Sequence, residues 1–302
     1  MEKYSEETLN NWRKPASESE EQKISNAISM IKEAVKLHDS LNGSDIEFIV
    51  QGSYGNNTNV KLESDIDICA MFKSTFFTEY RDGASDMDYG FHDGAHSFLD
   101  YRSYVIEAMY KKFGNENITV GNKSIKIKSN TYRVQADVVP AFQYRNYRND
   151  KNNDIHNFVE GIKFITSNGE SIVNYPKIHI KNGVSKNAAT SRKYKRTIRL
   201  FKKIRNIMIE EGLPIPNSIN SFLIEGLLWN TPNTVFSSIT TWNELLQNSL
   251  IHQYNNTDSD VKCKNWGEVS EYFYLFHSSR KWSRADVNNF LLQMWNYLGY
   301  SK

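Results

Sequence analysis

The sequence predicts an α+β fold followed by a helical domain, with the boundary near residue 185. Three observations predict this. Strand-like runs alternate with amphipathic helix patterns before that point, and strand patterns fade after it. The length of 302 residues allows about two domains at ~150 residues each. The 39% of hydrophobic residues is typical of globular proteins that bury a sizeable core.

The composition also excludes several classes of protein. Two cysteines give neither a disulfide framework nor an unaided structural zinc site, which favours a reducing, cytoplasmic setting. No apolar run approaches the ~18 to 20 residues of a membrane span, and the polar N-terminus is unlike a signal peptide, so we expect no membrane association. A net charge of +2 argues against a general nucleic-acid coat.

The first domain is expected to mix helices and strands. Residues 21–38 place apolar side chains three and four apart, which predicts an amphipathic helix. Short β-branched runs predict strands at 46–51 and 65–72, the second alternating acidic and apolar side chains. The other elements expected here are a helix at 99–113, strands at 124–128 and 133–142, and a hairpin at 162–166 and 170–173.

The second domain is expected to be helical. A long helical pattern covers 188–211, and Gly212 and Pro214 end it. Further helices are expected at 218–229, 266–276 and 284–298. The predicted domains are therefore 1–185 and 186–302.

Three aspartates carry the strongest chemical signal. Asp65 and Asp67 are two residues apart on a predicted strand, so their side chains project from the same face. Their mutual repulsion is costly unless a cation neutralises it, and ligands that are all oxygen suit Mg²⁺. Asp137, in the strand predicted at 133–142, is placed to complete a three-carboxylate site from an adjacent strand.

A Gly-Ser pair follows the first predicted strand. Gly52 lets the backbone approach a phosphate closely, and Ser53 adds a hydroxyl to the backbone N–H groups of an anion cradle. A Gly-Ser turn or a pair of aspartates alone is more often a solvated surface feature. In this order, strand, Gly-Ser, Asp-Ile-Asp and a later single Asp, they predict a two-metal site for nucleotidyl transfer.

This combination resembles the nucleotidyltransferase superfamily of DNA polymerase beta and poly(A) polymerase. The flanking residues resemble the cyclic-oligonucleotide synthases of bacterial anti-phage signalling, relatives of animal cyclic GMP-AMP synthase, and most closely their clade E. The segments that carry the resemblance are QGSYGNNTNV at 51–60, SDIDI at 64–68, ADVVPAF at 136–142, GIKF at 161–164, NYPKIH at 174–179 and NG at 182–183. The resemblance covers almost the whole chain and implies a polymerase-beta-like core of mixed sheet and helices plus a C-terminal helical domain, with the active site in the cleft between them.

The resemblance implies an enzyme that joins two ribonucleoside triphosphates and releases pyrophosphate. Two Mg²⁺ ions, with Mn²⁺ as a substitute, are expected on Asp65, Asp67 and Asp137, and Asp137 also helps to deprotonate the attacking hydroxyl. The residues expected to contact phosphates are Gln51, Gly52, Ser53, Lys202 and Ser221. Asn174 is the candidate for base recognition because its amide both donates and accepts hydrogen bonds, although an asparagine in a turn more often bonds the backbone.

Lys202 belongs to a basic helical segment, 192–205, whose cations either bind triphosphate or simply cover a solvated flank. Glu225 either orients Lys202 or is an exposed helix glutamate. The implied product is a cyclic dinucleotide, either cyclic di-GMP or one that contains a pyrimidine. The implied partner is an effector that responds to it, of the STING type in some relatives, and no activation by duplex DNA is expected. Two alternatives stay open: a linear or group-modifying nucleotidyltransferase acting on RNA ends or a small molecule, and a nucleotide-binding module with a degenerate site.

Overall fold

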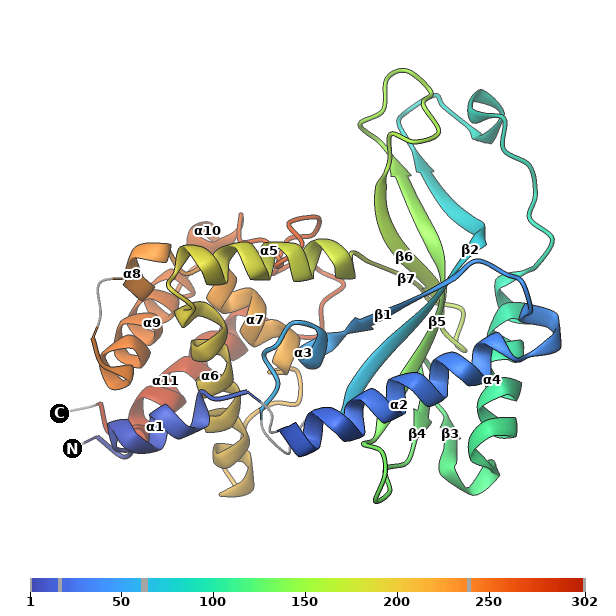
Figure 1. Ribbon diagram of the computed structural model, residues 1–302. Helices are drawn as coiled ribbons and strands as arrows, with labels where there is room; N and C mark the ends of the chain where they lie inside the picture. Colours follow the sequence, from blue (N-terminus) through green and yellow to red (C-terminus); the bar gives the residue numbers. More distant parts are fainter. Residues whose placement is uncertain (1, 16–17, 61–64, 238–239, 301–302) are drawn as a thin grey trace. The chain divides into compact units, whose positions relative to one another are not determined.

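The computed structural model describes residues 2–15, 18–60, 65–237 and 240–300. The backbone divides into two compact units (Figure 1). The sheet unit comprises Glu18–Gly55 and Asp65–Lys177, and the helical unit comprises the described residues of Met1–Ser17, Asn56–Ser64 and Ile178–Lys302. The compact units group the N-terminal segment and the residues after Gly55 with the helical unit, whereas the sequence predicts two continuous domains, 1–185 and 186–302. That domain division stays a prediction.

The described part of the sheet unit contains a seven-stranded mixed sheet. Its strands are β1 (Ile46–Gln51), β2 (Ile66–Tyr80), β3 (Ile118–Val120), β4 (Ile125–Ile127), β5 (Ala136–Tyr147), β6 (Val159–Ile165) and β7 (Ser171–Asn174). The order is β1-β2-β5-β4-β3, and β6 pairs with the distal part of β5 and with β7. Among the strand pairs that the structure describes, β2 and β5 run parallel and the others are antiparallel. The long strands β2 and β5 therefore form the centre of the unit.

Helices α2 (Glu18–Lys36) and α4 (Phe98–Phe113) lie along the same face of this sheet (Figure 1). The apolar stripe of α2, including Ile24 and Ile31, packs with Val105 of α4 and with Ile68 of β2 in one core. Burial of these apolar side chains stabilises the layered arrangement. Short elements complete the unit: η1 (Asp39–Leu41), α3 (Gly52–Gly55), η2 (Asp86–Tyr89) and η3 (Asn115–Asn117). The α+β prediction is confirmed, with strand β3 as an element that the sequence pattern missed.

The helical unit is built from helices around a second apolar core. Its elements are α1 (Glu6–Trp12), α5 (Pro176–Ala189), which begins in the last residues of the sheet unit, α6 (Lys193–Glu210), α7 (Ser221–Trp229), α8 (Asn233–Ser237), α9 (Trp242–Asn256), α10 (Asp260–Cys263) and α11 (Arg284–Tyr297). Ile198 of α6, Leu223 of α7, Leu246 of α9 and Phe290 of α11 meet in this core. None of the described helices is both long enough and apolar enough to cross a membrane.

Two helix predictions need correction. The helix expected at 188–211 begins only at Lys193, because Ser191 and Arg192 have φ of 50° and 63° and break the chain away from α5. The helix expected at 266–276 is wrong: this segment forms turns around an isolated bridge between Gly267 and Tyr274, and Glu271 has φ of 63°. In the helical unit, helices α1, α5, α8, α9 and α10 were not predicted.

Candidate functional site

One row of paired residues across the sheet carries most of the predicted site. Asp67 on β2 pairs with Gln51 on β1 and with Asp137 on β5, and Asp137 pairs in turn with Lys126 on β4. Directly paired residues of neighbouring strands point to the same face of a sheet. The row therefore places the carboxylates of Asp67 and Asp137 side by side between Gln51 and Lys126. These four residues form the carboxylate row. The structure confirms the predicted meeting of Asp67 and Asp137 on adjacent strands.

Asp137 is half-buried and only partly satisfied. Its Oδ2 accepts a hydrogen bond from the Ser124 hydroxyl at 3.1 Å, whereas its Oδ1 is buried and has no hydrogen-bond partner among the described residues. Burial raises the pKa of Asp137; Lys126 and Ser124 oppose this shift, and the negative charge of Asp65 adds to it. A buried carboxylate oxygen without a protein donor is suited to a cation.

Asp65 precedes β2 and is exposed to solvent. Its Oδ2 accepts a hydrogen bond from the side-chain amide of Gln135 at 2.6 Å, which holds it beside the same end of the sheet. Across the ranges that the structure describes, no group of three or more His, Cys, Asp or Glu side chains already converges on one metal position. The donor set is nevertheless entirely oxygen and includes the unpartnered Oδ1 of Asp137. It fits a divalent cation that takes its other ligands from water and phosphate.

Gly52 lies against the Asp67 carboxylate. It begins α3 with φ of 64°, in the left-handed region that favours glycine. A Cβ at this position would overlap Oδ2 of Asp67 and come within 2.9 Å of its Cγ. Glycine is therefore required twice, by the backbone angle and by the neighbouring carboxylate. The phosphate contacts of Gln51, Gly52 and Ser53 stay predictions, but these residues lie at the strand end beside Asp67.

The helical unit holds a buried ion pair that involves Lys202. The Lys202 ammonium lies 2.5 Å from Oε1 of Glu225 and 3.1 Å from the Thr58 hydroxyl. His179 Nε2 lies 2.9 Å from Oε2 of Glu225, and Thr58 and Asn56 donate hydrogen bonds to the same carboxylate at 2.5 and 3.4 Å. Lys202 and Glu225 are only 1% and 4% exposed, so Glu225 is not the exposed glutamate that was one alternative. The phosphate contact of Lys202 stays a prediction, and its observed contacts are those of a structural ion pair.

Replacing Glu225 with glutamine is expected to destabilise the helical unit by about 3–5 kcal/mol, because the Lys202 ammonium would stay buried without a counter-ion. Urea unfolding followed by tryptophan fluorescence measures this directly. The six tryptophans of the chain lie in the helical unit, at positions 12, 229, 242, 266, 282 and 295. The exposed Glu210→Gln is the matched control and should change stability by less than about 0.5 kcal/mol. The double variant Lys202→Met/Glu225→Gln should recover much of the loss.

The same variant has an expected pH signature. Although burial disfavours the charged form of Glu225, Lys202 and His179 hold its pKa at about 2. In the unfolded chain the pKa of a glutamate carboxyl is about 4.3. Because the pKa of Glu225 is lower in the folded state, the ion pair stabilises the fold above pH 4.3, and this stability is lost as the pH falls toward 2. The wild type should therefore lose more stability than Glu225→Gln between pH 5 and pH 3. Equal stability of wild type and Glu225→Gln at pH 7 would contradict the assigned ion pair.

The two remaining predicted residues lie in different units. Ser221 opens α7 in the helical unit, with its hydroxyl 3.5 Å from Nη2 of Arg205. Asn174 ends β7 and pairs with Ile162 of β6, which pairs with Gln143 of β5. Gln143 is six residues from Asp137 along one strand, roughly 20 Å. Because six is even, Asn174 faces the same side of the sheet as Asp137.

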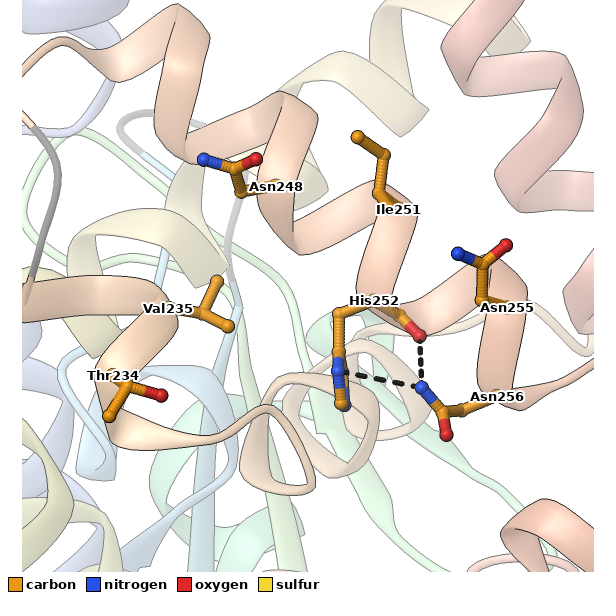
Figure 2. Close-up of a pocket in the computed structure, with 7 residues that line it drawn as sticks. All are labelled: Thr234, Val235, Asn248, Ile251, His252, Asn255 and Asn256. Carbon is orange, nitrogen blue, oxygen red and sulfur yellow. Dashed lines mark hydrogen bonds between the residues drawn. The ribbon is translucent and has the colours of Figure 1, made fainter.

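A pocket in the helical unit offers different chemistry. Figure 2 shows the lining side chains from α8 and α9: Thr234, Val235, Asn248, Ile251, His252, Asn255 and Asn256. The Asn256 amide donates a hydrogen bond to the backbone carbonyl of His252 at 2.8 Å. Burial lowers the pKa of His252, so none of the seven side chains carries a charge at neutral pH. This pocket lacks groups that bind phosphate by charge, and the carboxylate row remains the candidate active site.

Sequence reasoning missed Ser124 and Lys126 as neighbours of Asp137. The available signal was the strand predicted at 124–128, in which polar residues alternate with Ile125 and Ile127. That alternation separates the two faces of the strand but does not say which other strand lies beside it.

Comparison with known proteins identifies the family. Residues 181–299 match the cGAS/DncV-like nucleotidyltransferase C-terminal helical domain, and residues 28–129 match the nucleotidyltransferase domain. The cyclic dipyrimidine nucleotide synthase CdnE of Cecembia lonarensis is 43% identical over 300 residues, which cover 99% of this chain and 100% of that protein. The chain belongs to the cGAS/DncV-like nucleotidyltransferases. Within this family it is a CdnE-type cyclic dinucleotide synthase. The cyclic dipyrimidine nucleotide synthase CdnE of Legionella pneumophila is 35% identical, over 97% of each chain.

Solved structures of the family agree with the fold. The Rhodothermus marinus CdnE c-UMP-AMP synthase with Apcpp and Upnpp has a TM-score of 0.85 at 27% identity, over 99% of this chain and 98% of that one. The Elizabethkingia meningoseptica CdnE cyclic dinucleotide synthase with GTP and Apcpp has a TM-score of 0.79 at 31% identity, over 98% of this chain and 100% of that one. Nucleotidyltransferases of this family generally use divalent metal ions, and the carboxylate row of this chain supplies the oxygen ligands that such ions prefer.

Proposed function

We propose that this CdnE-type enzyme joins two ribonucleoside triphosphates, at least one of them a pyrimidine nucleotide, in a Mg²⁺-dependent reaction. The pyrimidine assignment is supported by the names of the 43% and 35% identical relatives, both cyclic dipyrimidine nucleotide synthases. The c-di-GMP synthases among the solved structures are 17% and 18% identical and support the fold alone. Of the two products expected from the sequence, the one that contains a pyrimidine is therefore preferred.

The observation that carries the transfer chemistry is the pairing of Asp67 with Asp137 beside the Gly52 backbone. Asp65, Asp67 and Asp137 are the residues that would hold two Mg²⁺ ions, or Mn²⁺ in their place. When bound, these cations would neutralise the carboxylates and stabilise charge on the attacking and leaving oxygens. The backbone at Gly52 and the Ser53 hydroxyl would orient the donor triphosphate, and Lys202 and Ser221 are the proposed contacts from the helical unit.

Asp137 is proposed to receive the proton of the acceptor ribose hydroxyl. Its Oδ1 has no hydrogen-bond partner among the described residues, which leaves an acceptor atom for this proton. The hydroxyl oxygen forms a bond to the donor α-phosphorus as the bond to the bridging oxygen of the β-phosphate breaks, and pyrophosphate leaves with that electron pair. The linear dinucleotide then undergoes a second transfer of the same kind, which closes the ring.

Product identification tests this function. The purified chain is incubated with all four labelled ribonucleoside triphosphates and Mg²⁺, treated with phosphatase, and analysed by mass spectrometry beside Asp65→Asn/Asp67→Asn. We expect a phosphatase-resistant cyclic dinucleotide that contains a pyrimidine and is absent from the variant. A resistant product made only of purines would overturn the base assignment. Products that phosphatase degrades would instead support the linear or group-modifying nucleotidyltransferase.

Asn174 is proposed to read a nucleobase through its side-chain amide. Asn174→Ala is expected to reduce discrimination between pyrimidine and purine nucleotides by about tenfold, because one hydrogen-bonding partner of the base is lost. The measurement is the ratio of bases incorporated when all four nucleotides compete. Asn168→Ala, in the exposed turn of the β6–β7 hairpin, is the matched control. An unchanged ratio in Asn174→Ala would rule out the base-reading role.

The product is proposed to act through a cyclic-dinucleotide-responsive effector in the cytoplasm, as part of anti-phage defence. The family membership supports this proposal, and the STING-type effector is one candidate class. An effector activated by the purified product, but not by its phosphodiesterase digest, would support the assignment.

A further inference from the structure

Strand β4 presents a cation, Lys126, beside Asp137. Lys126 pairs directly with Asp137, and Ser124 on the same face donates to its carboxylate. Ile125 and Ile127, which flank Lys126, are fully buried in the core and by strand alternation point to the opposite face. Lys128 follows Lys126 by two residues. Both lysines are exposed, and neither has a carboxylate within 4.0 Å in the part of the chain that the structure describes.

Some lysines of the sheet unit form ion pairs, whereas others, such as Lys36 of α2, have no carboxylate within 4.0 Å among the described residues, as is the case for Lys126 and Lys128. Lys73 lies near Asp45 and Glu47, and Lys177 bridges Glu47 and Glu160 at 2.6 and 2.5 Å. Exposed lysines often protect the edge of a sheet from pairing with another chain. That explanation does not apply to Lys126, because β4 lies between β5 and the edge strand β3.

We propose that Lys126 and Lys128 bind the triphosphate of the acceptor nucleotide. This inference rests on the proposed function, in which the acceptor hydroxyl meets Asp137. The acceptor is itself a triphosphate, and its polyanionic chain is attached to the same ribose as the attacking hydroxyl. That chain carries several negative charges of its own, which favours cationic side chains beside the acceptor ribose.

The order of strands separates the two nucleotides. Gly52, the expected donor cradle, lies at the end of β1 against Asp67 of β2. Asp137 on β5 and Lys126 on β4 follow in that order on the other side of Asp67. Neighbouring strands are about 4.8 Å apart, so Lys126 is one strand from Asp137 and two strands from Asp67. Lys126 and Gly52 therefore lie on opposite sides of Asp67 in the strand order, so we assign Lys126 and the neighbouring Lys128 to the acceptor rather than to the donor.

Substrates that can play only one role test the assignment. A 2′,3′-dideoxynucleoside triphosphate can donate but cannot accept. An α,β-methylene nucleoside triphosphate can accept but cannot release pyrophosphate, and the matching nucleoside is an acceptor without phosphates. Initial rates of linear dinucleotide formation are measured for wild type, Lys126→Gln/Lys128→Gln and the control Lys36→Gln, an exposed lysine of α2 in the same unit. Thermal unfolding checks that all three proteins are folded.

In Lys126→Gln/Lys128→Gln we expect the KM for the methylene acceptor to rise about tenfold or more, since charge-assisted hydrogen bonds to phosphate are lost. The KM values for the nucleoside acceptor and the dideoxy donor should change less than twofold, as should every KM in Lys36→Gln. An equal rise for both acceptors, a rise confined to the donor, or no rise would overturn the assignment. Absence of transfer by the wild type would instead refute the proposed function and this inference with it.

Discussion

Replacing Asp67 with asparagine is expected to lower the rate of dinucleotide formation by at least about a thousandfold, which corresponds to about 4 kcal/mol of transition-state stabilisation. Asp67 is paired with Asp137 and touches the Gly52 backbone, so it lies at the centre of the carboxylate row. Asparagine keeps the size of the side chain but removes the negative charge that attracts a divalent cation. Initial rates of pyrophosphate release at saturating Mg²⁺ measure the effect.

The control for Asp67→Asn is Asp82→Asn, an exposed aspartate of the same unit, which should retain the wild-type rate. Folding of Asp67→Asn should be intact, because removing one of several neighbouring negative charges relieves repulsion. Mg²⁺ should raise the thermal unfolding temperature of the wild type more than that of Asp67→Asn, since a ligand stabilises the state that binds it. A variant with more than a tenth of the wild-type rate would exclude Asp67 from the catalytic role.

The site was predictable where local patterns determine it. Residues two apart on a strand share a face, so the spacing of Asp65 and Asp67 predicts that they project together; in the structure Asp65 precedes β2, and the joint projection stays a prediction. The parallel pairing of β2 with β5 joins residues about 70 positions apart, and no local pattern specifies it. Asp137 was nevertheless predicted as the third carboxylate from the strand pattern at 133–142. Lys126 was not predicted, because its position beside Asp137 follows only from the register of β4.

Side-chain capping explains one boundary that the sequence pattern placed wrongly. Between α5 and α6 the Thr190 hydroxyl accepts a hydrogen bond from the backbone N–H of Tyr194, and the Asn187 side chain accepts one from that of Lys195. These side chains satisfy the first N–H groups of α6 and permit a break in a pattern that otherwise reads as one helix.

The burial of Glu225 could not be predicted from its own helix, because its partners His179 and Lys202 come from two other helices.

The second large effect is expected from Gly52→Ala, which should abolish detectable transfer and lower stability. The backbone angle alone costs an alanine roughly 1–2 kcal/mol. The added Cβ would also overlap Oδ2 of Asp67, so the carboxylate must move or the start of α3 must shift. Either change displaces the metal ligand from the backbone that is expected to hold the donor phosphates. Initial rates and thermal unfolding followed by circular dichroism measure the two consequences.

Gly43→Ala separates the two causes. Gly43 also has a positive φ, 76°, but nothing lies within 4 Å of the Cβ that alanine would add. It should therefore lose a similar amount of stability to backbone strain while keeping the wild-type rate. If both variants were equally active, close packing of Gly52 against Asp67 would not matter for catalysis. If both were equally inactive, loss of stability rather than displacement of the carboxylate would explain Gly52→Ala. Only a loss specific to Gly52→Ala follows from the observed contact.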